Sequence, residues 1–177
     1  MTRVLVMGPS GSGKSTLARE LGAALGLEVV HLDQLFWRPG WKEPPPEEFR
    51  AAVLEALERP RWVIDGNYFG SGAGEERLAA CDTIVVLDFP RRVCMWRVLR
   101  RIAGSYGRVR PDLAEGCPEQ VDLEFLRWVW TSPSRRPEMF ARLEPYRGKR
   151  RFVVLRNAGE VRRFLAGLRP EANTGRA

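Results

Sequence analysis

The residues that point most directly to chemistry form a glycine-rich stretch near the start of the chain. Gly8-Pro9-Ser10-Gly11-Ser12-Gly13-Lys14-Ser15 matches the phosphate-binding pattern G-x-x-x-x-G-K-[ST] at every fixed position. Its glycines permit positive φ angles and a close approach of the backbone to an anion. We expect Lys14 to reach the β- and γ-phosphates of a nucleotide and the Ser15 hydroxyl to bind Mg²⁺. The nucleotide-binding residues predicted here are Gly8, Ser10, Gly11, Ser12, Gly13, Lys14, Ser15 and Thr16.

The elements around this loop argue against a chance match in a Gly/Ser-rich turn. An apolar strand is predicted over residues 3–7 and a helix over 14–25, ended by Gly26. In a strand–loop–helix unit, backbone N–H groups and the positive end of the helix both face a bound phosphate. A second strand, predicted over residues 27–32, completes a βαβ unit.

Two aspartates at predicted strand ends are candidates for catalysis. Ligands bind beyond the carboxyl ends of the strands in an open parallel sheet. Asp33 is therefore placed to meet the acceptor, with Trp37 as a wall of its pocket. His31 has either a functional or a structural role, and the tryptophans either line the pocket or pack in the core. Asp65 follows a strand over residues 61–64 and would position Mg²⁺ through water if that strand lies beside the first; a plain Asp-Gly turn is the alternative.

The rest of the chain predicts one α/β domain over residues 1–177. Helices are expected over 46–58, 75–80, 91–103, 121–130, 136–146 and 159–168, and further strands over 83–89 and 152–155. Residues 31–60 would bind the acceptor, and the Gly- and Pro-containing segment 104–120 would form a lid. Residues 169–177 are expected to be a disordered tail.

Charge is distributed unevenly along the chain. Residues 1–90 carry 9 basic and 13 acidic side chains, whereas residues 91–177 carry 20 basic and 9 acidic ones. Arginines near the loop would suit a polyanionic substrate, although a nucleic-acid surface is the other interpretation. The three cysteines form no C-x-x-C pair, which argues against a disulfide framework or zinc site. With neither a signal peptide nor a membrane span expected, we predict a cytoplasmic protein; its oligomeric state is left open.

Taken together, these motifs resemble the adenylate kinase-like branch of the P-loop kinases. The resemblance rests on the loop, the Val63-Ile64-Asp65-Gly66 strand end, and Pro90 followed seven and eleven residues later by Arg97 and Arg101. It implies a three-layer α/β/α fold with a five-stranded parallel sheet in the order 2-3-1-4-5. It also implies that Arg97 contacts the adenine or a phosphate, that Arg101 is a catalytic lid-hinge arginine, and that Asn157 lies in the loop lining the adenine.

Two further resemblances bear on the substrate. The words His31-Leu32-Asp33, Arg110-Pro111-Asp112 and Glu115-Gly116-Cys117-Pro118-Glu119 resemble the bacterial DNA-topology modulation proteins. The placement of Asp33 is similar to that in shikimate and gluconate kinases, where an aspartate contacts the acceptor hydroxyl. The arginine-bearing region that binds the acceptor phosphate in adenylate kinases is absent, which argues against AMP.

The sequence therefore predicts an ATP- and Mg²⁺-dependent kinase of a small molecule, with Lys14, Asp33, Asp65 and Arg101 in catalysis. Asn67, two residues after Asp65, and Arg135, at the junction of two helices, are expected to join Asp33 and Trp37 in binding the acceptor. The alternative is an ATP-binding regulator that contacts nucleic acid through its basic half and hydrolyses ATP slowly. No helix-turn-helix, zinc-finger or aromatic RNA-binding signature supports that alternative.

Overall fold

A five-stranded parallel sheet forms the centre of the computed structural model, which describes residues 1–168. The strands are β1 (Arg3–Met7), β2 (Val29–His31), β3 (Trp62–Asp65), β4 (Thr83–Leu87) and β5 (Arg151–Leu155). They lie in the order β2-β3-β1-β4-β5, which confirms the predicted topology. Because the strands are parallel, their carboxyl ends meet at one edge of the sheet, where the phosphate-binding loop follows β1.

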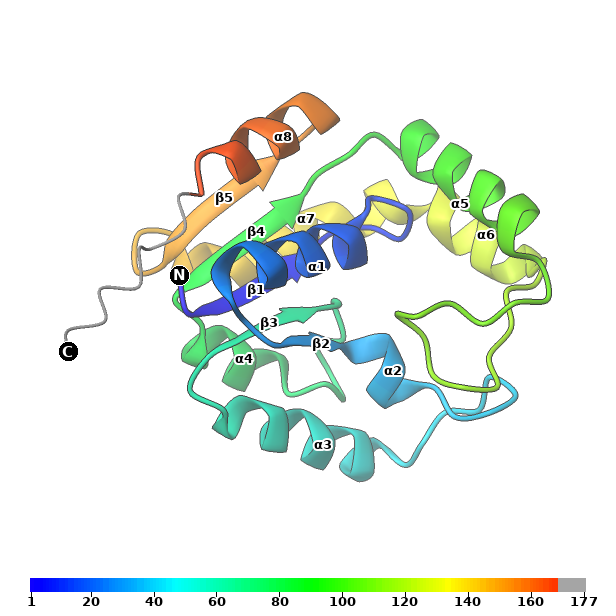
Figure 1. Ribbon diagram of the computed structural model, residues 1–177, viewed down its shortest axis with the longest axis horizontal. Helices are drawn as coiled ribbons and strands as arrows, with labels where there is room; N and C mark the ends of the chain where they lie inside the picture. The colour runs from blue at the N-terminus through cyan, green and yellow to red at the C-terminus, as the bar shows by residue number, and fades with distance from the viewer. Residues whose placement is uncertain (169–177) are drawn as a thin grey trace.

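Helices cover both faces of the sheet, as a parallel sheet requires (Figure 1). Alternate strand residues point to opposite faces, so Val4 and Val6 pack in one cluster and Leu5 and Met7 in the other. The first cluster includes residues of α1 (Lys14–Leu25), α5 (Arg91–Ser105), α6 (Leu123–Trp130) and α8 (Ala158–Ala166). The second includes residues of α2 (Leu32–Phe36), α3 (Pro46–Glu58), α4 (Gly74–Ala80), α7 (Ser132–Leu143) and the 3₁₀ turn η1 (Glu144–Tyr146).

Several element boundaries differ from the predicted ones, and three of them are described here. Strand β2 is shorter than predicted, and the short helix α2 begins at Leu32, so Asp33 lies on a helix. Strand β4 ends at Leu87 rather than at residue 89. Helix α7 begins at Ser132, where a break was expected, because Pro133 occupies the first helical turn, which tolerates proline.

The segment between α5 and α6 lies against the segment that follows α2 (Figure 1). Gly40 donates its backbone N–H to Gly116 O at 2.9 Å, and Trp41 donates its indole Nε1–H to Pro118 O at 3.1 Å. The predicted lid and the predicted acceptor segment therefore contact one another directly.

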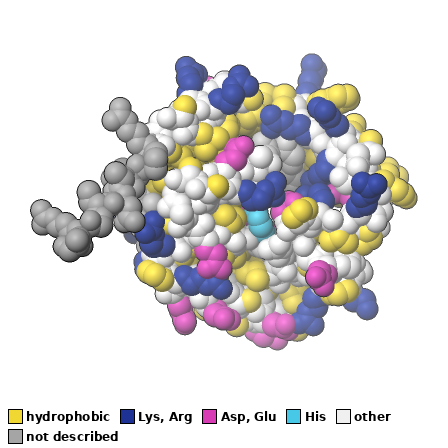
Figure 2. Space-filling model, viewed as in Figure 1, with side chains coloured by type: hydrophobic (Ala, Val, Ile, Leu, Met, Phe, Trp, Pro, Cys, Tyr) yellow, Lys and Arg dark blue, Asp and Glu magenta, His cyan; other side chains and the backbone are white. Residues whose placement is uncertain are grey.

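The charge asymmetry of the sequence is visible on the surface. Figure 2 shows basic side chains around a hollow on the side of α5 and α6, with most of the acidic ones on this face lying toward α3 and α4. No helix among residues 1–168 is long and apolar enough to span a bilayer. The predicted tail at residues 169–177 lies outside the described part of the chain.

Candidate active site

The glycine-rich loop connects β1 to α1 and adopts a backbone that only glycine accepts easily. Gly8 has φ +141° and Gly11 has φ +79°. A Cβ atom on Gly11 would lie 2.3 Å from Cys94 O, so the loop is also packed tightly against α5. The Ser12 hydroxyl is buried without a hydrogen-bond partner among the described residues. A glycine cradle with an unused buried hydroxyl fits a bound polyphosphate.

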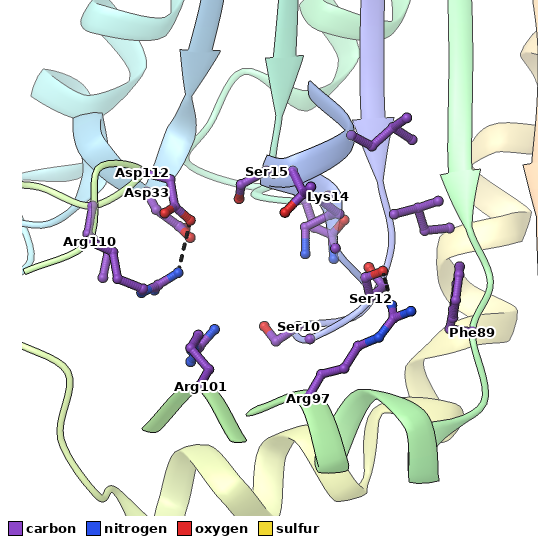
Figure 3. A pocket seen from close by; sticks show the side chains of 18 of the residues that line it. Ser10, Ser12, Lys14, Ser15, Asp33, Phe89, Arg97, Arg101, Arg110 and Asp112 are labelled. Carbon is purple, nitrogen blue, oxygen red and sulfur yellow. Dashed lines mark hydrogen bonds and ion pairs between the residues drawn. The ribbon is translucent and has the colours of Figure 1, made fainter. Parts of the chain in front are cut away.

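Lys14 lies at the centre of the site. Its ammonium group donates to Pro9 O at 3.1 Å, and burial lowers its pKa, an effect that the nearby Asp33 and Asp65 carboxylates oppose. Lys14 and Ser15 both line a cavity of about 890 Å³ that extends from the loop to α2. Figure 3 shows that Lys14, Ser15 and Asp33 point into the same part of this cavity.

Asp65 lies at the end of β3, beside β1, as the strand order requires. Its carboxylate is buried and is hydrogen-bonded to His31 Nδ1 at 2.6 Å, across a pair of residues in register on β2 and β3. Neither His31 nor Asp65 is among the residues that line the cavity. The sequence offered both residues as separate candidates, but their pairing depends on strand register.

Asn67 supports the loop as well as lining the cavity. Its side-chain oxygen accepts the Gly8 N–H at 3.1 Å, and its side-chain nitrogen donates to Gly8 O at 3.0 Å. This two-bond contact fixes the start of the phosphate-binding loop to the end of β3. Sequence reasoning predicted Asn67 as an acceptor ligand and did not anticipate this positioning contact.

Asp33 faces the cavity from α2 and is held by Tyr68. The Tyr68 hydroxyl donates to Asp33 Oδ1 at 2.6 Å, and burial together with this carboxylate raises the tyrosine pKa well above its usual value. Aromatic rings enclose this end: Trp37 makes edge-to-face contacts with Phe36 at 4.9 Å and with Trp41 at 5.3 Å. The acceptor end of the cavity therefore combines one carboxylate with flat apolar walls.

The two arginines predicted on α5 both line the cavity. Arg97 donates to Ser12 O at 2.8 Å and stacks over the Phe89 ring at 4.6 Å from its centroid. Arg101 is paired with Glu119 of the lid at 3.0 Å, and burial lowers its pKa. Arg97 thus contacts the phosphate-binding loop directly, whereas Arg101 connects α5 to the lid.

The lid supplies charged residues to which sequence reasoning gave no individual role. Arg110 pairs with Asp112 at 2.9 Å and with Glu119 at 2.8 Å, and all three line the cavity. Charged side chains clustered within a Gly- and Pro-containing segment were the available signal. Their convergence on the loop was not visible, because it depends on how the lid folds over the site.

Asn157 and Arg135 are two further predicted site residues that do not line the main cavity. Asn157 accepts the Glu160 N–H at 2.9 Å and so caps helix α8; Ala158, next to it, does line the cavity. Arg135 lies in a second cavity of about 600 Å³, where it stacks over Trp128 at 4.4 Å from the ring centroid. Asn67 lines both cavities, which places Arg135 near the acceptor end without direct contact with Asp33.

The loop, the sheet order and the cavity closed by arginines define a P-loop protein of the kinase type. Over 146 residues the chain is 30% identical to the cytidylate kinase of Ignicoccus hospitalis, which covers 73% of this chain and 77% of that protein. No family model matches. The chain belongs to the P-loop kinases and is an ATP-dependent phosphotransferase acting on a small molecule.

Solved structures agree with this fold. A gluconokinase from Sinorhizobium meliloti superimposes with a TM-score of 0.54 at 22% identity, over 94% of this chain and 91% of that one. A shikimate kinase from Acinetobacter baumannii in complex with shikimate also gives a TM-score of 0.54, at 20% identity over 94% of this chain and 89% of that one. These comparisons do not support the narrower resemblance to DNA-topology modulation proteins.

Proposed function

We propose that this kinase transfers the γ-phosphoryl group of Mg²⁺-bound ATP to a hydroxyl group that Asp33 orients. The observation that carries the proposal is the shared cavity: the Asp33 carboxylate is close enough to Lys14 for its charge to affect the lysine pKa, and Arg97 and Arg101 of α5 and Arg110 of the lid line the same cavity. The acceptor oxygen would bond to the γ-phosphorus as the bond to the β–γ bridging oxygen breaks, and Asp33 would take the hydroxyl proton.

Each of the charged residues would act on one part of this reaction. Lys14, Arg97 and Arg101 would neutralise negative charge on the transferred group, where electrostatic stabilisation is the main contribution to catalysis. Tyr68 would hold Asp33 in one orientation through its 2.6 Å hydrogen bond. Bound Mg²⁺ would supply further positive charge to the site. The Ser15 hydroxyl is an oxygen ligand of the kind that Mg²⁺ prefers.

The walls of the acceptor end favour a flat or apolar hydroxyl compound. Arg38 and Arg50, in the predicted acceptor segment, are paired with Glu48 and Glu76, and neither lines the main cavity. Trp37 and Tyr68 would instead contact the body of the acceptor. A nucleoside is one compound with both a flat ring and hydroxyl groups.

A nucleoside monophosphate is the second candidate, because the relative described above is a cytidylate kinase. Its phosphate would need a cation, and Arg135 in the second cavity makes no salt bridge within residues 1–168. Arg135 would then contact the acceptor phosphate. Asn67, which lines both cavities, would lie between Arg135 and the part of the acceptor that Asp33 contacts.

A screen of ATP consumption tests the proposal. The acceptors are nucleosides, nucleoside monophosphates, sugars and hydroxy acids, and the matched control is Lys14→Met. We expect one class to stimulate ATP use, with turnover about 100-fold or more lower in the variant. Stimulation by no class, or an unchanged rate in Lys14→Met, would contradict it.

The regulator alternative has its own test. Four arginines of the basic half line each of the two cavities beside the loop, which supports a polyanionic small ligand over a nucleic-acid stripe. If the protein contacts several nucleic-acid phosphates, its affinity should fall steeply with salt. Absence of binding at low salt would remove this alternative. Activity in the cytoplasm stays a prediction.

A further inference from the structure

The lid is joined to residues 34–42 along most of the length of both segments. Each of the hydrogen bonds between them is donated to a backbone carbonyl oxygen: Gln34 to Pro111 at 2.6 Å, Gly40 to Gly116 at 2.9 Å, Cys117 to Arg38 at 3.1 Å, and Trp41 to Pro118 at 3.1 Å. A Cβ atom on Gly116 would lie 2.8 Å from Pro39 Cβ, so the two backbones also pack closely. Because these contacts are spread along both segments, we expect the segments to move together.

Trp41 differs from the other residues of this joint because it also belongs to the main cavity. Of the eight residues that make the four hydrogen bonds, Trp41 alone lines that cavity. Its ring packs edge-to-face against Trp37, with 5.3 Å between the ring centroids, at the end of the cavity that contains Asp33. One side chain therefore contacts both the wall of the acceptor end and the lid.

The backbone of Trp41 is strained. Its φ is +61°, in the left-handed region that is unfavourable for a residue with a Cβ atom. Backbone hydrogen bonds of 2.9 and 3.3 Å between Arg38 and Lys42 close the turn that contains it. Strain of this kind persists only where the surrounding contacts over-determine it, and it is concentrated at functional sites. The turn therefore points to a functional requirement for the position of this indole ring.

On the lid side, the contact of Trp41 leads directly to the charged residues of the cavity. Pro118, which accepts the indole N–H, is followed by Glu119. The Glu119 carboxylate is bonded to Arg101 at 3.0 Å and to Arg110 at 2.8 Å, and all three of these residues line the cavity. The position of Pro118 thus affects where both guanidinium groups lie.

We propose that Trp41 is a positioning residue that links acceptor binding to the placement of Arg101 and Arg110. The inference rests on the proposed function, because it takes ATP and an acceptor as the two ligands of the cavity. An acceptor packed against Trp37 would hold Trp41 and, through it, the lid. ATP in contact with the two arginines would in turn hold Trp41. Each ligand would then favour binding of the other, since a coupling free energy between two sites is reciprocal.

Hydrogen exchange followed by mass spectrometry tests this link from the nucleotide side, where no acceptor is needed. The probe is adenosine 5′-(β,γ-imido)triphosphate with Mg²⁺, and exchange is measured in residues 8–15, 107–119 and 38–42. The Gly40 N–H reports the joint directly because it is bonded to Gly116 O. In wild type we expect the analogue to slow exchange in all three segments.

The variant Trp41→Phe keeps a ring but removes the indole N–H. We expect the analogue to slow its loop and lid as in wild type. The slowing at residues 38–42, measured as the ratio of the exchange rates without and with the analogue, should be about 3- to 10-fold smaller, as expected for loss of one hydrogen bond between neutral groups. An acceptor found by the ATP-consumption screen gives the reciprocal measurement: it should tighten analogue binding about 3- to 10-fold more in wild type than in Trp41→Phe.

Trp96→Phe is the matched control. It removes an indole N–H from a ring of α5 that is 65% exposed, and it should respond to the analogue as wild type does. A thermal melt establishes that both variants are folded. A purely structural role of Trp41 would speed exchange at residues 38–42 equally with and without the analogue and would leave the ratio unchanged.

Two results would overturn the proposal. The same ratio at residues 38–42 in Trp41→Phe and in wild type would exclude the link. Slowing of the loop and the lid of wild type without any slowing at residues 38–42 would show that the two segments respond separately. Absence of slowing in residues 8–15 of wild type would instead overturn the proposed function, and the inference that rests on it.

Discussion

Arg77 is a buried arginine whose removal should be costly although it touches no substrate. It is 1% exposed, and its guanidinium donates to four carbonyl oxygens, those of Gly66, Asn67, Tyr68 and Gly72, at 2.8–3.2 Å. Burial lowers the pKa of Arg77 to about 10, which leaves the group charged at neutral pH. One side chain of α4 therefore holds the segment that carries Asn67 and Tyr68.

Arg77→Met should lower the free energy of unfolding by about 3–5 kcal/mol, the range seen when one member of a buried charged contact is removed. Hydrogen bonds to a charged donor contribute about 1.5–3 kcal/mol each. Because the methionine variant no longer has to bury a charge, the desolvation cost that it avoids offsets part of this loss. Because Asn67 fixes Gly8 and Tyr68 fixes Asp33, KM should rise for both ATP and the acceptor.

Urea unfolding followed by tryptophan fluorescence measures the first effect, and initial rates measure the second. Arg77→Lys should fall between wild type and Arg77→Met, since one ammonium group cannot reach all four carbonyls. Arg92→Met, which removes an exposed arginine from α5, should stay within about 0.5 kcal/mol of wild type. A loss below about 1 kcal/mol in Arg77→Met would refute the reasoning, because buried carbonyls left unpaired cost at least that much.

Two further substitutions test the loop and the pH dependence of stability. Gly11→Ala should abolish detectable ATP-analogue binding, because its Cβ would lie 2.3 Å from Cys94 O. Gly26→Ala, at φ +63° in open space, should lower the free energy of unfolding by only about 1 kcal/mol and leave binding intact. Equal effects of the two substitutions on binding would contradict this. Burial raises the pKa of Asp82, but hydrogen bonds, including two from Thr2, outweigh it and lower the pKa to about 2. The stabilisation that comes from this lowered pKa is present above the pKa of the unfolded state and is lost as the pH falls through the folded-state pKa. Between pH 6 and 2.5 the free energy of unfolding of wild type should therefore fall by about 1 kcal/mol more than that of Asp82→Ala, after allowance for solvent screening. Urea unfolding measures this difference, and parallel pH curves for the two proteins would exclude the role.

Much of the site could be predicted from residues that lie close together in the sequence. Residues 8–15 are contiguous, and their glycine spacing, neighbouring strand and following helix predict the loop without knowledge of any distant contact. The apolar runs predicted every strand, and the family resemblance supplied the sheet order that the structure confirms. These features were predictable because the determining interactions lie within a few residues of one another.

The boundaries that were predicted differently lie where the same residues are compatible with two local structures. The apolar pattern of residues 27–32 is compatible with one strand, but in the structure the strand ends at His31 and helix α2 begins at Leu32 and includes Asp33. Ser132-Pro133 signalled a break, and a proline in a first helical turn signals a start just as well. The sequence at these points is compatible with two local structures, and packing selects one.

Chain sequence by itself determined that a phosphate-binding loop follows the first strand and that carboxylates and arginines are available around it. Only the tertiary structure decided how those charges are paired: Asp65 with His31 through strand register, and Arg101 with Glu119 and Asp112 with Arg19 through the lid. The physical reason is that charge pairing acts through space between residues far apart in the chain. Which carboxylates line the cavity with Ser15 therefore depends on the fold and not on the spacing of residues in the sequence.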